Sequence, residues 1–542
     1  MNSELIKDIK ELKGAKWIIG ILSIVAVITY GYFLTHSTIG MDDTAIERYF
    51  IDGWAPHVGR WTLFLLNAVL DFAHFTPWFM DVIGVMLLCL SAYLFCVLWY
   101  RISDRKAGTL SMVAFATVYI TYPLLGEVYI YYLHNGISLS FCFMALAGLA
   151  WWEYLSKGKR KQIIWVTVFL SVAIGCYESF ALVYMVLICG IYVLAIIKNT
   201  VAKKKVLPWL KDAALAVSPL LLAMIIRKIM YTLINAGLGM STDARDMSKL
   251  ELWIVNNPLV ILKDLLHQFV VRYVINGEFI FGIMVYAVTT AVFVVAMLIY
   301  AISKKKWNLL FWSVLIVATP WSLLLVELVL TPYRATQALM LFVALVWFIC
   351  YELAMSIRGQ KKQQMMHYIL AVVMFVVVFR QGFELHHYFY FDSMKDAYNS
   401  EYCERLAYEL NSNYDTENKP VIFIGQREMP KALRDCVYQD VNNLSLVHYG
   451  YVDEYGYRVW DIGCSDMIAW STWADLGDDE YEIYRYMEML GYDFIQPSAE
   501  MRMELVNDAT ENREYPIWPR AGSIVETDEY ICVYMGPITV SM

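Results

Sequence analysis

The chain has 542 residues, of which 59% are hydrophobic and only 17% are charged. A soluble globular protein has about 45–50% apolar and about 25% charged residues. One large soluble core is therefore excluded, and the composition indicates many segments that are solvated by lipid. The basic residues stand in short clusters between apolar runs, which argues against a nucleic-acid partner.

Charge divides the chain into two regions. Residues 391–542 contain 29 Asp and Glu against 11 Lys and Arg, a net charge of −18. Because the whole chain carries −8, residues 1–390 carry +10. Such an asymmetry indicates two parts with different surroundings. We therefore expect a transmembrane domain over 1–390 and an acidic C-terminal domain over 391–542.

Apolar runs long enough to cross about 30 Å of hydrocarbon recur along the first region. In chain order they are residues 17–34, 78–100, 107–125, 136–154, 163–177, 180–197, 207–226, 279–302, 307–330, 335–355 and 366–388. No small-residue cleavage site follows the first run, so we expect an uncleaved first span. The sequence thus predicts an α-helical polytopic membrane protein with about eleven transmembrane helices.

The basic clusters predict the orientation of these helices, because short loops rich in Lys and Arg stay cytoplasmic. With eleven spans and a cytoplasmic N-terminus, all of the clusters fall on one side. They are the N-terminal lysines, RISDRK (101–106), SKGKRK (156–161), KNTVAKKK (198–205), SKKK (303–306) and RGQKK (358–362). The expected location is the plasma or inner membrane, with a multi-pass topology and an extracytoplasmic C-terminal domain.

Two long loops, 36–77 and 231–278, face outward in this topology. In the second loop, Leu262, Leu266 and Tyr273 share one helical face, a pattern typical of a helix that lies in the membrane interface.

The C-terminal region is expected to form a compact, soluble α/β domain. Its predicted elements are a helix at 395–410, a buried strand at 421–425, a helix at 479–490 and a strand pair within 523–536. Four cysteines fall in this domain, namely Cys403, Cys436, Cys464 and Cys532. They allow three disulfide pairings outside the cell, or they are buried reduced thiols.

The loop after the first span gathers candidate catalytic groups. Asp42 and Asp43 lie a few residues beyond that span, and Arg48, His57 and Arg60 follow in the same loop. A carboxylate at the outer membrane surface can accept a proton from an acceptor hydroxyl during group transfer. The alternative is that the acidic pair only caps an interfacial helix, since Asp is a good N-cap.

Several motifs relate the chain to a known family. MDD (41–43) and GRW (59–61) precede a long second span, and TPYR (331–334) precedes the tenth. KPVIFIG (419–425) and IWPRAGSIVETDEYICVY (517–534) stand in the C-terminal region. With these motifs the chain resembles the bacterial serotype-converting glucosyltransferases, which modify O-antigens and other surface polymers and have the multi-span C-type (GT-C) glycosyltransferase architecture.

The resemblance implies a polyprenyl-phosphate sugar donor, a surface polysaccharide acceptor, transfer on the outer face and inversion at the anomeric carbon. Such chemistry needs a carboxylate for the attacking hydroxyl, with Asp42 preferred slightly over Asp43. It also needs a cation for the donor phosphate. Arg334 and Arg60 suit that role because a guanidinium makes bidentate contacts with phosphate; the alternative for each is an interfacial anchor.

Other polar residues near the outer ends of the spans are candidates for substrate binding. Glu178 joins two spans with almost no loop, and ionisable groups at membrane depth are costly and often functional, although a structural ion pair is the alternative. Glu127 and His134 flank an aromatic loop that suits a sugar ring or forms an interfacial aromatic belt. The complete set is Arg48, His57, Glu127, His134, Glu178 and Tyr333.

The sequence lacks a P-loop, a dinucleotide-binding glycine motif and zinc-ligand spacing. No cofactor is implied, and whether a divalent metal ion is needed stays open. The predicted activity is transfer of a hexosyl group, in the first place glucosyl, from polyprenyl phosphate to a cell-surface polysaccharide. The alternatives are a lipid-linked oligosaccharide flippase or other transporter, and a polysaccharide polymerase or ligase. A transporter typically has inverted repeats, and the sequence contains no internal repeat.

Overall fold

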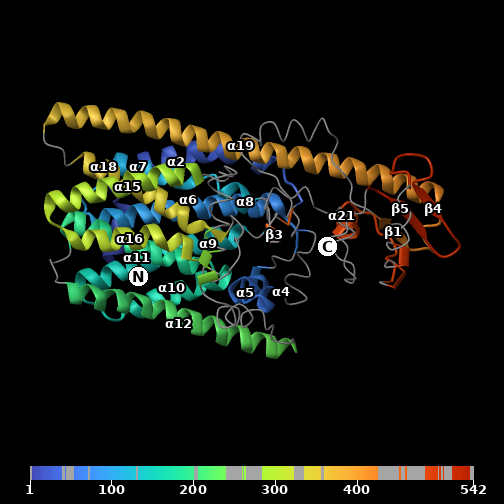
Figure 1. The fold of residues 1–542 in the computed structure, drawn as a ribbon, viewed down its shortest axis with the longest axis horizontal. Helices are drawn as coiled ribbons and strands as arrows, with labels where there is room; N and C mark the ends of the chain where they lie inside the picture. Colours follow the sequence, from blue (N-terminus) through green and yellow to red (C-terminus); the bar gives the residue numbers. More distant parts are fainter. Residues whose placement is uncertain are drawn as a thin grey trace. The chain divides into compact units, whose positions relative to one another are not determined.

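The structure is a computed structural model that divides into two compact units (Figure 1). The helical unit comprises Met1–His36, Glu47–Phe389 and Tyr451–Trp460; the C-terminal unit comprises Ser37–Ile46, Tyr390–Gly450 and Asp461–Met542. The described residues are 3–39, 43, 54–70, 74–129, 132, 134–200, 206–239, 283–322, 335–355, 359–424, 451–452, 458–459, 482–498 and 515–536, with isolated positions within 259–266 and 500–505.

Long apolar helices make up the helical unit. They are α2 (Ala15–Tyr30), α6 (Pro77–Ile102), α7 (Thr109–Ile120), α9 (His134–Lys157), α10 (Gln162–Cys176), α11 (Phe180–Lys198), α12 (Val206–Leu238), α15 (Ile283–Lys304), α16 (Trp307–Ala318), α18 (Gln337–Ala354) and α19 (Gln360–Asn413), the last of which continues into the C-terminal unit. Shorter helices connect them, namely α1 (Ser3–Lys10), η1 (Phe33–Thr35), α4 (Trp54–His57), α5 (Trp61–Leu70), α8 (Leu125–Tyr129) and η4 (Thr319–Trp321).

Each predicted apolar run overlaps one of the long helices. Seven of the described helices are long and apolar enough to cross a membrane: α6, α9, α11, α12, α15, α18 and α19. The other four, α2, α7, α10 and α16, have 16, 12, 15 and 12 residues. The chain therefore has several candidate membrane-spanning helices, and the count of eleven spans stays a prediction.

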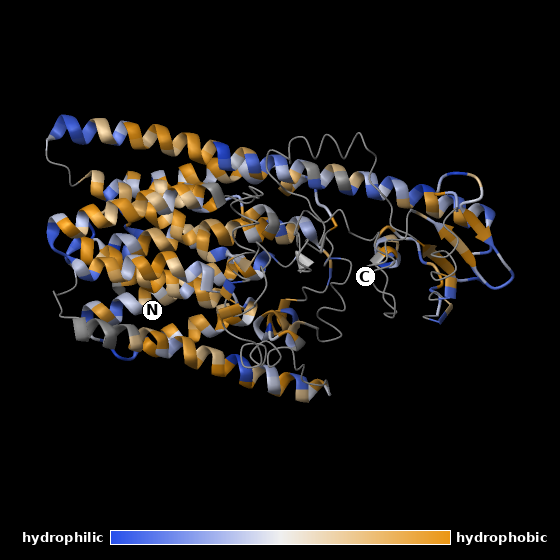
Figure 2. Cartoon of the chain, viewed as in Figure 1, coloured by the Kyte–Doolittle hydropathy of each residue, from blue (hydrophilic) through white to orange (hydrophobic). Residues whose placement is uncertain are grey.

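Burial separates inner from outer helices. In α11, 89% of the apolar window is buried, whereas the windows of α12 and α19 are only 17% and 11% buried. The outer helices expose large apolar side chains such as Leu221, Phe375 and Phe379, and long stretches of the α12 and α19 ribbons are orange in Figure 2. A monomeric soluble protein rarely exposes apolar patches of this extent, so these faces are suited to lipid.

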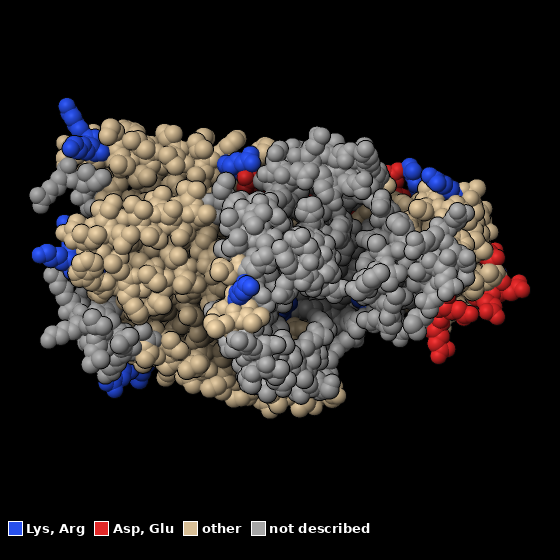
Figure 3. All heavy atoms as spheres, viewed as in Figure 1, with Lys and Arg blue, Asp and Glu red and all other residues tan. Residues whose placement is uncertain are grey.

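A network of buried charges closes one end of the helical unit, which we call the basic end. Arg101, near the end of α6, pairs with Glu153 of α9 and lies 3.1 Å from Asp8 of α1. Glu352, near the end of α18, pairs with Lys198 at the end of α11. Lys and Arg side chains stand along this end in Figure 3. Among those tied to it by contacts are Arg105, Lys157, Lys159 and Lys306.

The length of α6 measures the distance to the opposite end, which we call the far end. Asp81 and Arg101 are both buried, one near each end of this helix. Twenty residues at 1.5 Å per residue place them about 30 Å apart along the helix axis. The residues between them are mainly apolar, and this spacing equals the thickness of a bilayer's hydrocarbon core, about 30 Å.

Two boundaries differ from the sequence-based expectation. The last span and the helix at 395–410 were expected as separate helices, but α19 runs unbroken from Gln360 to Asn413, because this stretch contains no proline and Gly382 alone does not break a helix. The second outer loop was expected from Tyr231, but α12 continues to Leu238. The interfacial helix predicted in that loop falls largely outside the described residues.

The C-terminal unit contains a three-stranded sheet in the order β1-β5-β4. β1 (Val421–Ile424) pairs in parallel with β5 (Ile531–Tyr534), and β4 (Ile524–Glu526) pairs with β5 in antiparallel orientation. α21 (Glu482–Met489) and the end of α19 pack against this sheet through a shared core. The strand predicted at 421–425, the helix at 479–490 and the final strand pair are thus present.

The remaining described strands, β2 (Tyr451–Val452) and β3 (Arg458–Val459), form a short antiparallel pair that belongs to the helical unit. Cys403 and Cys532 are buried thiols in the structure, so the alternative of buried reduced cysteines holds for these two. Cys436 and Cys464 lie outside the described residues.

Candidate functional site

A tight turn between α4 and α5 positions Arg60 at the far end. Gly59 adopts φ +81°, a left-handed conformation that glycine enters without steric cost. The backbone N–H of Gly59 donates to Pro56 O at 3.0 Å, and that of Arg60 donates to Ala55 O at 2.8 Å. Thr62 Oγ1 donates to Val172 O at 3.0 Å, which fixes α5 against the end of α10.

Arg60 contacts the short turn between α10 and α11. Its Nε lies 3.6 Å from Glu178 Oε2, and its guanidinium carbon lies 4.5 Å from the centre of the Tyr177 ring. The ion pair and the cation–π contact hold the guanidinium from two sides. The sequence named Arg60 and Glu178 as separate candidates, and the structure brings them together.

A second arginine, Arg227 of α12, contacts the turn between α4 and α5 and was not identified from the sequence. Its Nη2 donates to Val58 O at 3.1 Å. A side chain at Gly59 would come within 2.6 Å of the same nitrogen, so glycine leaves room for the guanidinium. Arg227 Nε is buried and has no hydrogen-bond partner among the residues that the structure describes.

The signal for Arg227 was present in the sequence. The apolar run was taken to end at Ile226, yet α12 continues through Arg227 to Leu238. A charged residue inside a long apolar helix is costly and often marks a functional site. The charge of Arg227 inside an apolar helix is therefore a sequence signal of the same kind as Glu178.

The electrostatics of this cluster favour an anion. Partial burial acts to raise the pKa of Glu178, but the guanidinium groups of Arg60 and Arg227 outweigh it and hold that pKa below its usual value. Glu178 is therefore ionised at neutral pH, and two cations face one carboxylate. The net charge of +1 leaves the cluster able to accept a further negative group. Below, these three residues are called the arginine cluster.

The arginine cluster is joined to the start of α18. Ser179, which follows Glu178, donates a hydrogen bond from Oγ to Gln337 Oε1, and both residues are buried. Gln337 follows Arg334 by three positions in the sequence. Arg334 and Tyr333 themselves lie outside the described residues.

A second polar group at the far end contains His134. Its Nε2 lies 3.5 Å from Asp81 Oδ1, and both side chains are buried. Gly84 of α6 permits this approach, because a Cβ there would lie 2.5 Å from the His134 ring. The amide of the adjacent Asn135 is buried, and neither of its polar atoms has a hydrogen-bond partner within the described part of the chain.

The acidic pair is described only in part. Asp43 is 2% exposed and belongs to the C-terminal unit, while Asp42 lies outside the described residues. The preceding segment is tied to α19 in the same unit. Thr38 Oγ1 donates to Asp392 Oδ2 at 2.6 Å, and Ile39 N donates to Asp396 Oδ1 at 3.4 Å.

The remaining candidates are not described at the level of side chains. His57 lies in α4 and Glu127 in α8, and only their backbone is described. Arg48 lies outside the described residues altogether. Within the described ranges, no three His, Cys, Asp or Glu side chains are grouped as a metal site requires.

Comparison with known proteins identifies the family. The model of the glucosyl transferase GtrII family matches residues 31–350, more than half of the chain, and this range contains the helices from α4 to α16 and most of α18. No curated protein and no solved structure matches the chain. The matched range contains Arg60, Glu178 and Arg227. The chain therefore belongs to the GtrII glucosyl transferase family, and it is a glycosyltransferase with several apolar helices suited to a membrane.

Proposed function

We propose that the protein transfers a glucosyl group from a polyprenyl-phosphate donor to a cell-surface polysaccharide on the outer face of the plasma or inner membrane. The observation that carries this proposal is the arginine cluster. The Arg60 guanidinium lies beside Glu178 in the turn between α10 and α11, and the Arg227 guanidinium lies against Val58 in the turn that leads to Arg60. A lipid-linked phosphate enters such a site from the bilayer, and arginine is the side chain best suited to bind it.

The orientation follows from the two ends of the helical unit. Loops rich in Lys and Arg stay on the cytoplasmic side, so the basic end is placed inside. The far end, with the arginine cluster and the Asp81–His134 pair, is then outside. An acceptor polysaccharide at the cell surface has access to that end.

Arg60 and Arg227 are assigned to the donor phosphate. Their charges stabilise the phosphate that develops as the glycosidic bond breaks, which is where charge accumulates in the transition state. Glu178 holds the Arg60 side chain in place through the 3.6 Å ion pair. Arg334 is proposed as a third phosphate ligand, because Gln337, three residues later, is bonded to the neighbour of Glu178.

The reaction is a single displacement at the anomeric carbon. The acceptor oxygen forms a bond with C1 of the glucosyl group, and the bond between C1 and the phosphate oxygen breaks. The bonding electron pair leaves with polyprenyl phosphate, and the hydroxyl proton passes to Asp42 or Asp43 as general base. Attack opposite to the leaving group inverts the configuration at C1.

The test uses the purified full chain in lipid nanodiscs with radiolabelled polyprenyl-phosphoglucose. A transferase releases free polyprenyl phosphate as the label passes to polysaccharide or, slowly, to water. A flippase moves the donor and leaves its sugar–phosphate bond intact. Intact donor after prolonged incubation with acceptor would overturn the proposal, provided that thermal unfolding shows a folded protein.

A further inference from the structure

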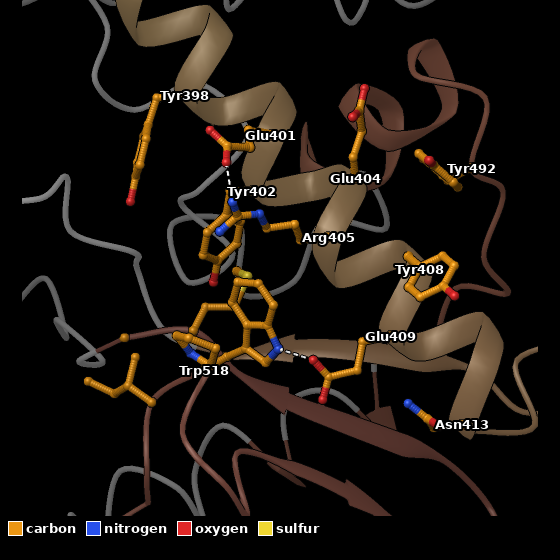
Figure 4. Close-up of a pocket in the computed structure, with 14 residues that line it drawn as sticks. Tyr398, Glu401, Tyr402, Glu404, Arg405, Tyr408, Glu409, Asn413, Tyr492 and Trp518 are labelled. Carbon is orange, nitrogen blue, oxygen red and sulfur yellow. Dashed lines mark hydrogen bonds and ion pairs between the residues drawn. The ribbon is translucent and has the colours of Figure 1, made fainter.

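The C-terminal unit contains a pocket that the proposed reaction does not use. Its volume is about 920 Å³, and it lies between the last turns of α19, the residues before β4 and the end of β5 (Figure 4). This volume is near the upper end of the range for small-ligand pockets, about 300–1,000 Å³. The lining side chains from α19 are Tyr398, Glu401, Tyr402, Glu404, Arg405, Tyr408, Glu409 and Asn413, and those from elsewhere include Tyr492, Ile517, Trp518 and Met535.

Aromatic rings form a fixed wall of this pocket. The rings of Tyr402 and Trp518 meet edge to face with centroids 4.6 Å apart. Trp518 Nε1 donates to Glu409 Oε2 at 3.0 Å, a contact that is visible in Figure 4. Both aromatic residues are 8% exposed, so they are held by packing, whereas Tyr408 at the rim is 74% exposed.

Carboxylates supply most of the charged groups in the lining. Glu401 and Arg405 are one helical turn apart on α19 and form an ion pair next to the Tyr402 ring in Figure 4. Glu404 and Glu409 add two further carboxylates, and Asn413 adds an amide. Three carboxylates against one guanidinium leave a charge of −2 in the lining. The pocket therefore offers many hydrogen-bond acceptors and repels anions.

We propose that this pocket binds an uncharged stretch of the acceptor polysaccharide, a short run of neutral hexose residues. A hexose ring presents apolar C–H faces that pack on aromatic rings, and hydroxyl groups around its edge that donate to carboxylates. The negative lining excludes uronic acids and phosphorylated sugars. That the occupant is the acceptor rests on the proposed function, whereas the neutral-sugar chemistry rests on the pocket alone.

Direct binding tests the pocket without the transfer reaction. Isothermal titration of the full chain in nanodiscs uses a neutral hexasaccharide prepared from the host's own surface polysaccharide, with hexagalacturonate as the anionic comparison. We expect the neutral hexasaccharide to bind and hexagalacturonate not to bind. The Tyr408→Ala and Glu401→Gln variants are each expected to weaken binding about tenfold, the cost of one hydrogen bond or packing contact to a ligand.

The matched control is Glu488→Gln, which removes an exposed carboxylate from α21 in the same unit but outside the pocket. It is expected to bind like the wild type. Both pocket variants change exposed side chains, so they keep the core intact. Equal affinity in wild type and both pocket variants, or tighter binding of hexagalacturonate, would overturn the inference.

A parallel assay separates this inference from the proposed function. If the protein binds the neutral hexasaccharide but does not cleave polyprenyl-phosphoglucose, the sugar-binding pocket is supported and the proposed donor is refuted. If the Tyr408→Ala and Glu401→Gln variants cleave the donor and keep the acceptor KM of the wild type, the proposed donor is supported. The pocket is then not the acceptor site.

Discussion

Replacing Arg227 by lysine tests whether the arginine cluster binds phosphate by shape as well as by charge. Arg227→Lys keeps the positive charge but has no planar fork. A lysine ammonium cannot donate to Val58 O, as Arg227 Nη2 does at 3.1 Å, and at the same time make two parallel bonds to a phosphate. Each lost hydrogen bond to a charged group costs about 1.5–3 kcal/mol. At 1.36 kcal/mol per tenfold change in rate, kcat/KM should fall about 10–10²-fold.

The assay is the initial rate of glucosyl transfer from polyprenyl-phosphoglucose, measured over a range of donor concentrations in nanodiscs. Lys228→Gln is the matched control, because Lys228 is the next residue of α12 but is exposed, with its ammonium 4.8 Å from the Tyr231 ring. It should leave kcat/KM within about twofold of wild type, as a surface charge contributes little. Wild-type kcat/KM in a stably folded Arg227→Lys protein would refute the assignment. An equal loss in Lys228→Gln would show that only the general positive potential matters.

Four further predictions follow from the geometry. Asp42→Asn and Asp43→Asn remove basicity at constant size, so the variant that loses the general base should transfer glucose about 10²–10⁴-fold more slowly; full activity in both would exclude the acidic pair. Gly59→Ala places a Cβ 2.6 Å from Arg227 Nη2 at φ +81°, so we expect lower activity and a lower melting temperature by differential scanning fluorimetry; an unchanged donor KM would show that the guanidinium is not used. Glu153→Ala removes the carboxylate that pairs with the buried Arg101, so it should destabilise the protein by about 3–5 kcal/mol. Thermal unfolding in detergent measures the change, with the exposed Glu11→Ala as the neutral comparison. Reporter fusions after Leu410 should be active only as extracytoplasmic enzymes, and cytoplasmic activity alone would contradict the eleven-span topology.

The positions of the long helices were predictable because each lies within or overlaps a run of apolar residues. Seven of the described helices are also long enough to cross a membrane, whereas the lengths of α2, α7, α10 and α16 did not follow from the runs. Helix ends were less predictable. The apolar run predicted over 207–226 stops one residue before Arg227, whereas the helix continues past Arg227 and its guanidinium lies against the turn at Gly59.

The candidate site was predictable as a set of residue types but not as an arrangement. Arg60 was predictable as a cation for phosphate near the outer surface, and Glu178 as a costly charge at membrane depth. Their pairing depends on α5 packing against α10, a contact between segments that are distant in the chain, and no local pattern encodes it. The His134–Asp81 pair is similar: the loop sequence predicted His134 as a candidate, but no local pattern links it to Asp81, which lies one turn into α6.

The two buried polar layers of the helical unit have a consequence for the lipids around it. Surface lysines and arginines adjust to a thinner or thicker membrane by bending their long side chains toward water. Arg101 and Asp81 have no such freedom, because their side chains are 5% and 7% exposed and are fixed by Glu153 and His134. The roughly 30 Å between them is set by the rise of α6. A bilayer of different thickness must deform around this unit or tilt it, at a cost of fractions of a kcal/mol per Å of hydrophobic mismatch. The acyl-chain length of the membrane is thereby coupled to the height at which the arginine cluster stands above the hydrocarbon.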